Sequence, residues 1–76
     1  MIYVIEAFDK QSELLVFEEV LPNGHDQELK EIMGWTDIQQ GWEGYNLTAK
    51  QLEALEGVLG KQIHNSAYSF QLSCNE

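Results

Sequence analysis

The end of the chain has the clearest alternation of apolar and polar residues. Apolar side chains occupy every second position there, at Tyr68, Phe70, Leu72 and Cys74. This two-residue period predicts a strand with one buried face. Residues 2–8 are rich in β-branched and aromatic types and predict another strand, and residues 13–21 predict a third. The polar residues 9–12 between them favour an antiparallel hairpin.

Two segments between the hairpin and the last strand have helical spacing. The first contains Leu29, Ile32 and Met33 at helical intervals. We expect Asp26 to cap its N-terminus, and Gly34 is suited to end it in the left-handed conformation. This helix is short, at about two turns.

The second helical segment has the stronger boundary signals. Thr48 and Gln51 have the spacing of a capping box, and Gly60 is suited to end the helix. The buried stripe is expected to consist of Leu52, Leu55 and Leu59. Gly57 lies inside this helix, where glycine costs about 1 kcal/mol relative to alanine. We therefore expect a close packing contact at Gly57.

The order of these elements predicts a single α+β domain over residues 1–76. The expected architecture is a three-stranded antiparallel sheet, formed by the N-terminal hairpin and the C-terminal strand, with two helices packed on one face in the order ββααβ. Residues 35–46 have no period and are expected to form a loop. The predicted core consists of Leu14, Val16, Leu29, Ile32, Leu52, Leu55, Leu59, Phe70 and Leu72.

The hairpin is more apolar than a sheet with one buried face requires. If Phe8 pairs with Glu13, then Leu15 and Phe17 share one face and Leu14 and Val16 share the other. Both faces are then largely apolar. Two interpretations remain open: side chains at the sheet edge fold over the surface, or an apolar face meets another molecule.

Charge restricts the possible partners. The chain has 13 acidic residues, four lysines and no arginine, which gives a net charge of −9. The acids are spread among apolar residues, so they predict a folded acidic surface rather than a disordered tail. Such a surface repels nucleic acid and anionic membranes and attracts basic proteins. Solubility alone is the competing explanation of this charge.

The sequence lacks the residue patterns that catalysis requires. Neither His25 nor His64 has a second ligand type at metal spacing, and Cys74 is interpreted as a small hydrophobic residue. There is no glycine-rich phosphate loop. We therefore expect no enzymatic activity, no metal and no cofactor. A single cysteine, together with the lack of a signal peptide or a membrane-length apolar run, predicts a cytoplasmic protein.

The aromatic residues of segment 35–46 make it a candidate binding site. Trp42 lies between Gly41 and Glu43 and is the best candidate for an exposed anchor, whereas Trp35 is also suited to the core. The predicted partner-binding residues are Trp42, Tyr45, Asp37, Glu43 and Trp35. The competing surface is the outer face of the hairpin, with Glu6, Glu13 and Glu19 as its charges.

Short stretches along most of the chain resemble the sequences of a known protein family. They are Phe8-Asp9-Lys10 with Ser12, Leu15-Val16-Phe17-Glu18, Leu21-Pro22, Tyr45, Leu47-Thr48, Gln51 and Tyr68-Ser69-Phe70. With these residues the chain resembles the small acidic immunity proteins of bacterial contact-dependent growth inhibition and other polymorphic toxin systems. The resemblance implies an antitoxin that neutralises one cognate toxin domain, commonly a basic nuclease, by stoichiometric binding.

Two other functions remain open at this point. The first is a nucleic-acid mimic of the anti-restriction or anti-CRISPR type, which requires regularly spaced surface carboxylates. The second is a small regulatory subunit whose apolar hairpin face forms a homodimer. The expected partner is thus a basic protein, with no direct binding of nucleic acid or membrane, and the chain itself is expected to be a monomer or a weak homodimer.

Overall fold

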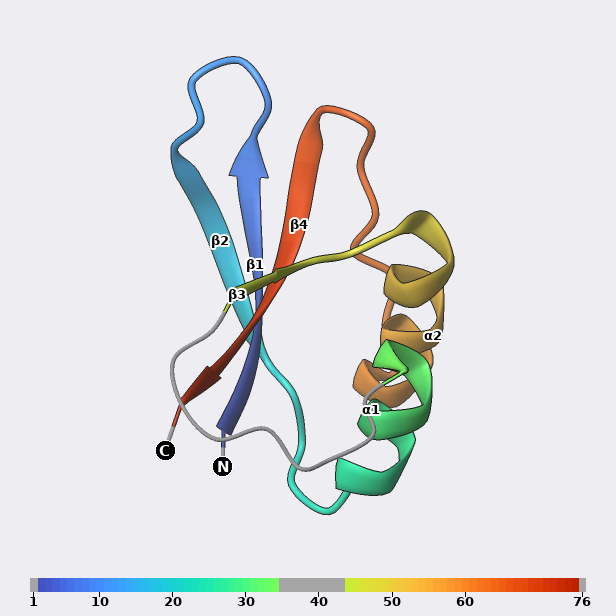
Figure 1. Cartoon of the computed structure of the whole chain (residues 1–76). Coiled ribbons are helices and arrows are strands. Elements are labelled where there is room, and N and C mark those ends of the chain that lie inside the picture. Colours follow the sequence, from blue (N-terminus) through green and yellow to red (C-terminus); the bar gives the residue numbers. More distant parts are fainter. Residues whose placement is uncertain (1, 35–43, 76) are drawn as a thin grey trace.

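A computed structural model of the chain describes residues 2–34 and 44–75. These residues form four strands and two helices, in the order β1 (Ile2–Asp9), β2 (Leu15–Val20), α1 (Asp26–Met33), β3 (Gly44–Asn46), α2 (Ala49–Leu59) and β4 (Tyr68–Asn75). The strands make one antiparallel sheet in the order β2-β1-β4-β3, and both helices lie on the same side of it (Figure 1). The predicted α+β class, with an antiparallel sheet and two helices, is confirmed.

The prediction of three strands is wrong, because residues 44–46 form β3 inside the expected loop. Tyr45 is opposite Leu72, so β3 extends the sheet beyond β4. This strand has only three residues. A two-residue period cannot be recognised over so short a stretch, particularly one that begins with glycine.

The core lies between the sheet and the helices. In the register of the sheet, Ala7 is opposite Phe70 and Ile5 is opposite Leu72. All four side chains are buried, and Leu29 from α1 and the predicted stripe of α2 pack onto them. The buried hydrophobic residues of this core are Tyr3, Ile5, Ala7, Leu21, Leu29, Leu52, Leu55, Phe70, Leu72 and Cys74. Val4 is also buried, but its side chain points to the other face of the sheet.

Most of the predicted core is confirmed. Ile32 and Leu59 are partly buried against the core. Leu14 and Val16 were expected in the core but are exposed. Leu14 precedes β2 and lies in the connection between the two strands. Val16 is displaced by a shift in the hairpin register, because Ala7 is opposite Phe17 whereas the next residue, Phe8, is opposite Leu15.

Val16 is therefore the extra residue of a β-bulge. The expected pairing of Phe8 with Glu13 is wrong. Beyond the bulge, Phe17 points to the helix side and packs against the core. Glu18 and Val20 point to the opposite side of the sheet.

The turn of the hairpin is organised by Asp9. Its Oδ1 accepts hydrogen bonds from the backbone N–H groups of Gln11, at 2.8 Å, and Ser12, at 3.0 Å. Glu13 then adopts a left-handed conformation with φ of 63°, and the Asp9 N–H donates to the carbonyl of Leu14. This positive φ lets the chain reverse within a short connection.

The boundary signals of α2 are confirmed. Thr48 Oγ1 accepts from the Gln51 N–H at 3.1 Å, and Gln51 Oε1 accepts from the Thr48 N–H at 3.0 Å. Gly60 ends the helix with φ of 79°. The expected contact at Gly57 is wrong, because a Cβ there would have no described atom within 4 Å apart from its chain neighbours and the backbone of its own helix.

The expected cap of α1 is also wrong. The N-cap is His25, and Asp26 is the first helical residue. His25 Nδ1 lies 2.8 Å from Glu28 Oε1, which links the cap to the first turn. Two carboxylates in that turn suit the positive end of the helix dipole. Within residues 2–34 and 44–75, no helix has both the length and the apolar composition needed to cross a bilayer.

Candidate protein interaction surface

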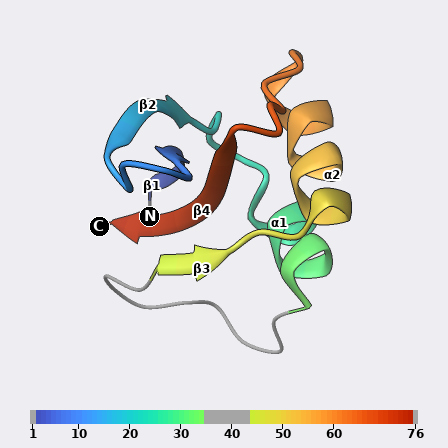
Figure 2. The same cartoon turned by 90° about the horizontal axis from the view of Figure 1, so that it is seen from above.

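The two faces of the sheet have different surroundings. The helices lie against one face, and no described element lies over the other (Figure 2). We call the second face the open face. By strand register it carries Ile2, Val4, Glu6 and Phe8 from β1, Leu15, Glu18 and Val20 from β2, and Ser69, Gln71 and Ser73 from β4.

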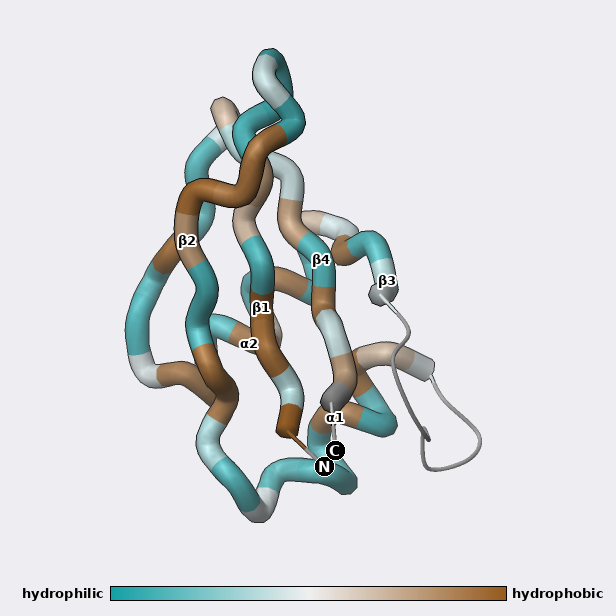
Figure 3. Tube along the Cα trace, turned by 90° about the vertical axis from the view of Figure 1, so that its left-hand side faces the viewer, coloured by the Kyte–Doolittle hydropathy of each residue, from teal (hydrophilic) through white to brown (hydrophobic). Residues whose placement is uncertain are grey.

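The exposed apolar side chains gather on the hairpin. Within the described residues, every large hydrophobic residue that is exposed belongs to β1, β2 or their connection. These residues are Ile2, Leu14, Leu15, Val16 and Val20, and we call them the hairpin patch. Leu14 is 69% exposed and Val20 is 62% exposed. Figure 3 views this side of the molecule, where brown apolar stretches run along β2 and β1. Exposed apolar side chains gathered in one region make the hairpin a candidate interaction surface.

Carboxylates interrupt the hairpin patch. Glu6 on β1 is directly opposite Glu18 on β2, and both point to the open face. Like charges at such positions destabilise a sheet by about 0.2–1 kcal/mol. Neither carboxylate forms an ion pair within the described residues. The pair is therefore unfavourable in the isolated chain and would become favourable next to a cation.

The other proposed hairpin charges lie elsewhere. Glu19 is opposite Ile5 and points to the helix side, where its Oε1 lies 2.7 Å from Lys61 Nζ. Glu13 is exposed in the connection between β1 and β2. Of the three acids expected on the outer hairpin face, Glu6 alone is on the open face. The structure adds Glu18, which sequence reasoning missed.

A shallow hollow lies at the end of the open face next to the hairpin connection. Its volume is about 470 Å³, and it is lined by Phe8, Asp9, Lys10, Glu13, Ser69 and Gln71. The backbone hydrogen bonds from Ser12 and Gln11 hold the pKa of Asp9 below its usual value. Asp9 and Glu13 could attract the charged end of a lysine or arginine side chain while Phe8 contacts its apolar stem.

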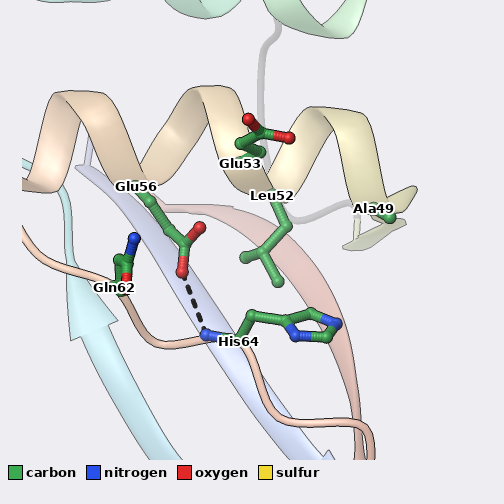
Figure 4. Close-up of a pocket in the computed structure, with 6 residues that line it drawn as sticks. All are labelled: Ala49, Leu52, Glu53, Glu56, Gln62 and His64. Atoms are coloured by element: carbon green, nitrogen blue, oxygen red, sulfur yellow. Dashed lines mark hydrogen bonds between the residues drawn. The ribbon is translucent and has the colours of Figure 1, made fainter.

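A second hollow lies beside α2 (Figure 4). Its volume is about 420 Å³, and its lining includes Glu53, Glu56 and His64. Glu56 Oε2 accepts hydrogen bonds from the backbone N–H groups of Ile63, at 2.6 Å, and His64, at 2.9 Å. The carboxylate of Glu56 therefore holds the connection between α2 and β4.

The ring of His64 also has a structural contact. It stacks on Phe70, with ring centroids 6.3 Å apart and planes inclined by 22°. No hydrogen bond joins this ring to Glu53 or Glu56, both of which are described. Nowhere in residues 2–34 and 44–75 do three histidine, cysteine, aspartate or glutamate side chains form a group that could hold a metal ion. The contacts of Glu56 and His64 thus hold the connection between α2 and β4 in place and do not form an acid–base pair.

The predicted binding residues of segment 35–46 are only partly described. Tyr45 is half-buried on β3 and packs against the core on the helix side of the sheet. It therefore lies on the opposite side of the sheet from the open face. Trp35, Asp37, Trp42 and Glu43 fall outside the described residues. Their proposed role in binding stays a prediction.

The comparisons with known proteins give a family. The family model described as "Domain of unknown function (DUF7683)" matches residues 2–73. The match includes the whole hairpin, both helices and most of β4. None of the curated proteins compared with the chain matches it.

Proposed function

This chain belongs to the DUF7683 family, and we propose that it is a non-catalytic inhibitor that binds one basic protein domain with one-to-one stoichiometry. One observation carries this proposal: on a sheet face that no described element covers, the exposed apolar side chains of Ile2, Leu15 and Val20 lie together with carboxylates that have no ion-pair partners among the described residues. The partner that suits this surface has apolar side chains and positive charges in close proximity.

The two parts of the surface have different roles in binding. The hairpin patch would supply affinity, because removing apolar surface from water contributes about 25 cal/mol per Å². The Glu6–Glu18 pair would supply selectivity, because a basic group placed between them relieves their repulsion. The net charge of −9 would accelerate the encounter with a basic partner.

The resemblance to immunity proteins suggests the class of partner. We propose that the partner is the toxin domain of a contact-dependent or related polymorphic toxin system, and that it is a nuclease. Nucleases need a basic surface to bind phosphates, and an acidic inhibitor is attracted to that surface. We place this function in the cytoplasm, where the single cysteine, Cys74, would remain reduced.

The composition of the open face favours a protein partner over nucleic-acid mimicry. A mimic needs carboxylates at regular spacing. On β2, the open-face acid Glu18 is flanked instead by Leu15 and Val20, both exposed. Apolar residues at these positions would have no counterpart in the phosphate backbone that a mimic replaces.

The proposal predicts that a gene next to that of this chain encodes a nuclease domain, and the purified domain would be used to test it. We expect calorimetric titration to give one-to-one binding, and increasing amounts of the chain to abolish cleavage of DNA or RNA. Glu18→Lys should weaken binding by about tenfold, equivalent to about 1.4 kcal/mol. Glu53→Lys on α2 is the matched control, because it changes the net charge equally but lies on an exposed helix position.

Two results would contradict the proposed function or the proposed surface. If the chain leaves the nuclease fully active at saturating concentration, the proposed function is wrong. If Glu53→Lys weakens binding as much as Glu18→Lys, then only the net charge matters and the open face is not the binding surface.

A further inference from the structure

We infer that β2 receives an extended basic segment of the partner as an additional strand, an inference that rests on the proposed binding to a basic protein. Among the described strands, β2 lies at one end of the sheet order and pairs with β1 alone. Strand addition at such an edge is a common mode of peptide recognition, in which backbone hydrogen bonds provide affinity and alternate side chains provide specificity.

The hydrogen-bond pattern identifies the available backbone groups. The Leu21 N–H donates to the Tyr3 carbonyl at 2.9 Å, so the backbone of Leu21 faces β1. Backbone groups alternate in direction along a strand. Those of Glu19 and Phe17 therefore also face β1, whereas the N–H and C=O groups of Glu18 and Val20 point away from the sheet.

The same two residues present their side chains to the incoming strand. Glu18 and Val20 point to the open face, and both are exposed. A residue of the partner that pairs with Glu18 would lie on the same face and would be favoured as lysine or arginine. The residue two positions away would pair with Val20 and would be favoured as apolar. The recognised segment thus alternates basic and apolar residues at every second position.

Neighbouring features define the length of this edge. Pairing is interrupted at Val16 by the bulge, and Pro22 cannot donate a backbone hydrogen bond. The regular edge therefore extends over residues 17–21. It matches a short extended segment of the partner rather than a long strand.

Charge favours a basic partner over a second copy of the chain. Proteins commonly protect sheet edges with lysine or proline, but residues 13–21 contain neither. They contain Glu18 and Glu19 instead. In a pair of β2 strands these glutamates would bring four carboxylates to one edge, and each copy carries a net charge of −9. Repulsion between the glutamates thus disfavours pairing of β2 with the β2 of a second copy, whereas a positively charged strand would be attracted to this edge.

Backbone methylation provides a direct test. The probe is the end-blocked peptide Val-Thr-Lys-Thr-Val in two isomers, with N-methyl groups either on the first valine and the lysine or on the two threonines. The first isomer lacks two of the donors that would pair with β2, and the second retains all of them. We expect the second to slow amide hydrogen exchange of Glu18 and Val20 by at least about tenfold, in line with a stability gain of about 1.4 kcal/mol for these hydrogen bonds.

Two controls accompany this measurement. The amides of Phe17 and Glu19 should change little, because they already face β1. The Glu18→Lys variant should reverse the side-chain preference and accept Val-Thr-Glu-Thr-Val instead. This variant should keep its fold, because the introduced lysine would face Glu6 as an opposite charge across the sheet.

The outcomes separate this inference from the proposed function. Equal effects of the two isomers, or no protection of Glu18 and Val20 in the complex with the nuclease, would overturn strand addition. Inhibition of the nuclease without that protection would leave the proposed function intact. Peptide-induced protection without inhibition would support strand addition and contradict the proposed function. Protection that grows with the concentration of the chain alone would identify a second copy as the occupant and overturn the inference.

Discussion

The two faces of the sheet are built from alternate residues of the same strands, yet they have opposite properties. On the helix side, Ile5 and Leu72 are opposite each other and fully buried. On the open face, Val20 is apolar and exposed, and Glu6 is opposite Glu18. The first face is explained by stability. The second contains apolar side chains outside the core and a charge pair that opposes folding, and the proposed binding would account for both.

The largest expected effect is on the helix side. Leu55 is fully buried among residues from the sheet and α2. Leu55→Ala should reduce the free energy of unfolding by about 2–5 kcal/mol, because it leaves a cavity in a small core. Urea denaturation measures this loss. A decrease below about 0.5 kcal/mol, the usual range for surface sites, would mean that Leu55 does not support the fold.

The same measurement on the open face should give a different result. Replacing Leu15 and Val20 together by threonine keeps the β propensity and removes apolar surface. We expect the free energy of unfolding to change by about 0.5 kcal/mol or less for each surface substitution. Affinity for the basic nuclease should fall by about tenfold, which titration calorimetry would detect. A large loss of stability with unchanged affinity would reverse the roles assigned to the two faces.

The charge pair offers a smaller but more selective test. Glu18→Gln removes the repulsion with Glu6 and should raise the free energy of unfolding by about 0.2–1 kcal/mol. It should also weaken binding to a basic partner. Glu19→Gln is the control on the helix side, where it disrupts the ion pair with Lys61 and should not stabilise the chain. Equal stabilisation by both variants would indicate that general net charge, rather than this pair, is responsible.

The smallest expected effect concerns Tyr3, which lies on the helix side of the sheet. The pKa of Tyr3 is raised above its ordinary value, mainly because the side chain is buried and to a lesser extent because Asp26 and Cys74 are nearby. The unfolded chain therefore loses this proton at lower pH than the folded chain. Stability should fall as pH rises above about 10, the ordinary pKa of tyrosine. Urea midpoints at increasing alkaline pH test this, and a Tyr3→Phe variant with an equally steep decline would contradict it.

Local signals in the sequence predicted structure well. The Thr48 capping box, the Gly60 helix end and the alternation of β4 each depend on residues close together in the chain, and each is present. The core between the sheet and the helices was predicted from the same kind of periodic spacing. Leu29, Leu55 and Leu72 are buried as expected, because one spacing rule applies along each element.

The candidate binding surface depended on information that is not local. An excess of apolar residues on the hairpin was visible in the sequence. The bulge at Val16, however, exchanges the faces of Phe17 and Glu18, and one extra residue in a strand leaves no periodic signal. The Glu6–Glu18 pair could therefore not be found before the register was known. The short strand β3 was missed for a related reason, since its stability depends on β4 rather than on its own residues.

The pairing of β1 with β4 has a consequence for how the chain folds. These are the first and last strands of the described chain, and they pair along their full length from Ile2 with Asn75 to Asp9 with Tyr68. During synthesis, β1 and β2 emerge long before β4. One edge of β1 then remains unpaired until β4 has been synthesised. Contacts between segments that are far apart in the sequence slow folding, and unpaired strand edges favour aggregation. The glutamates along β2 would keep nascent copies apart during that interval.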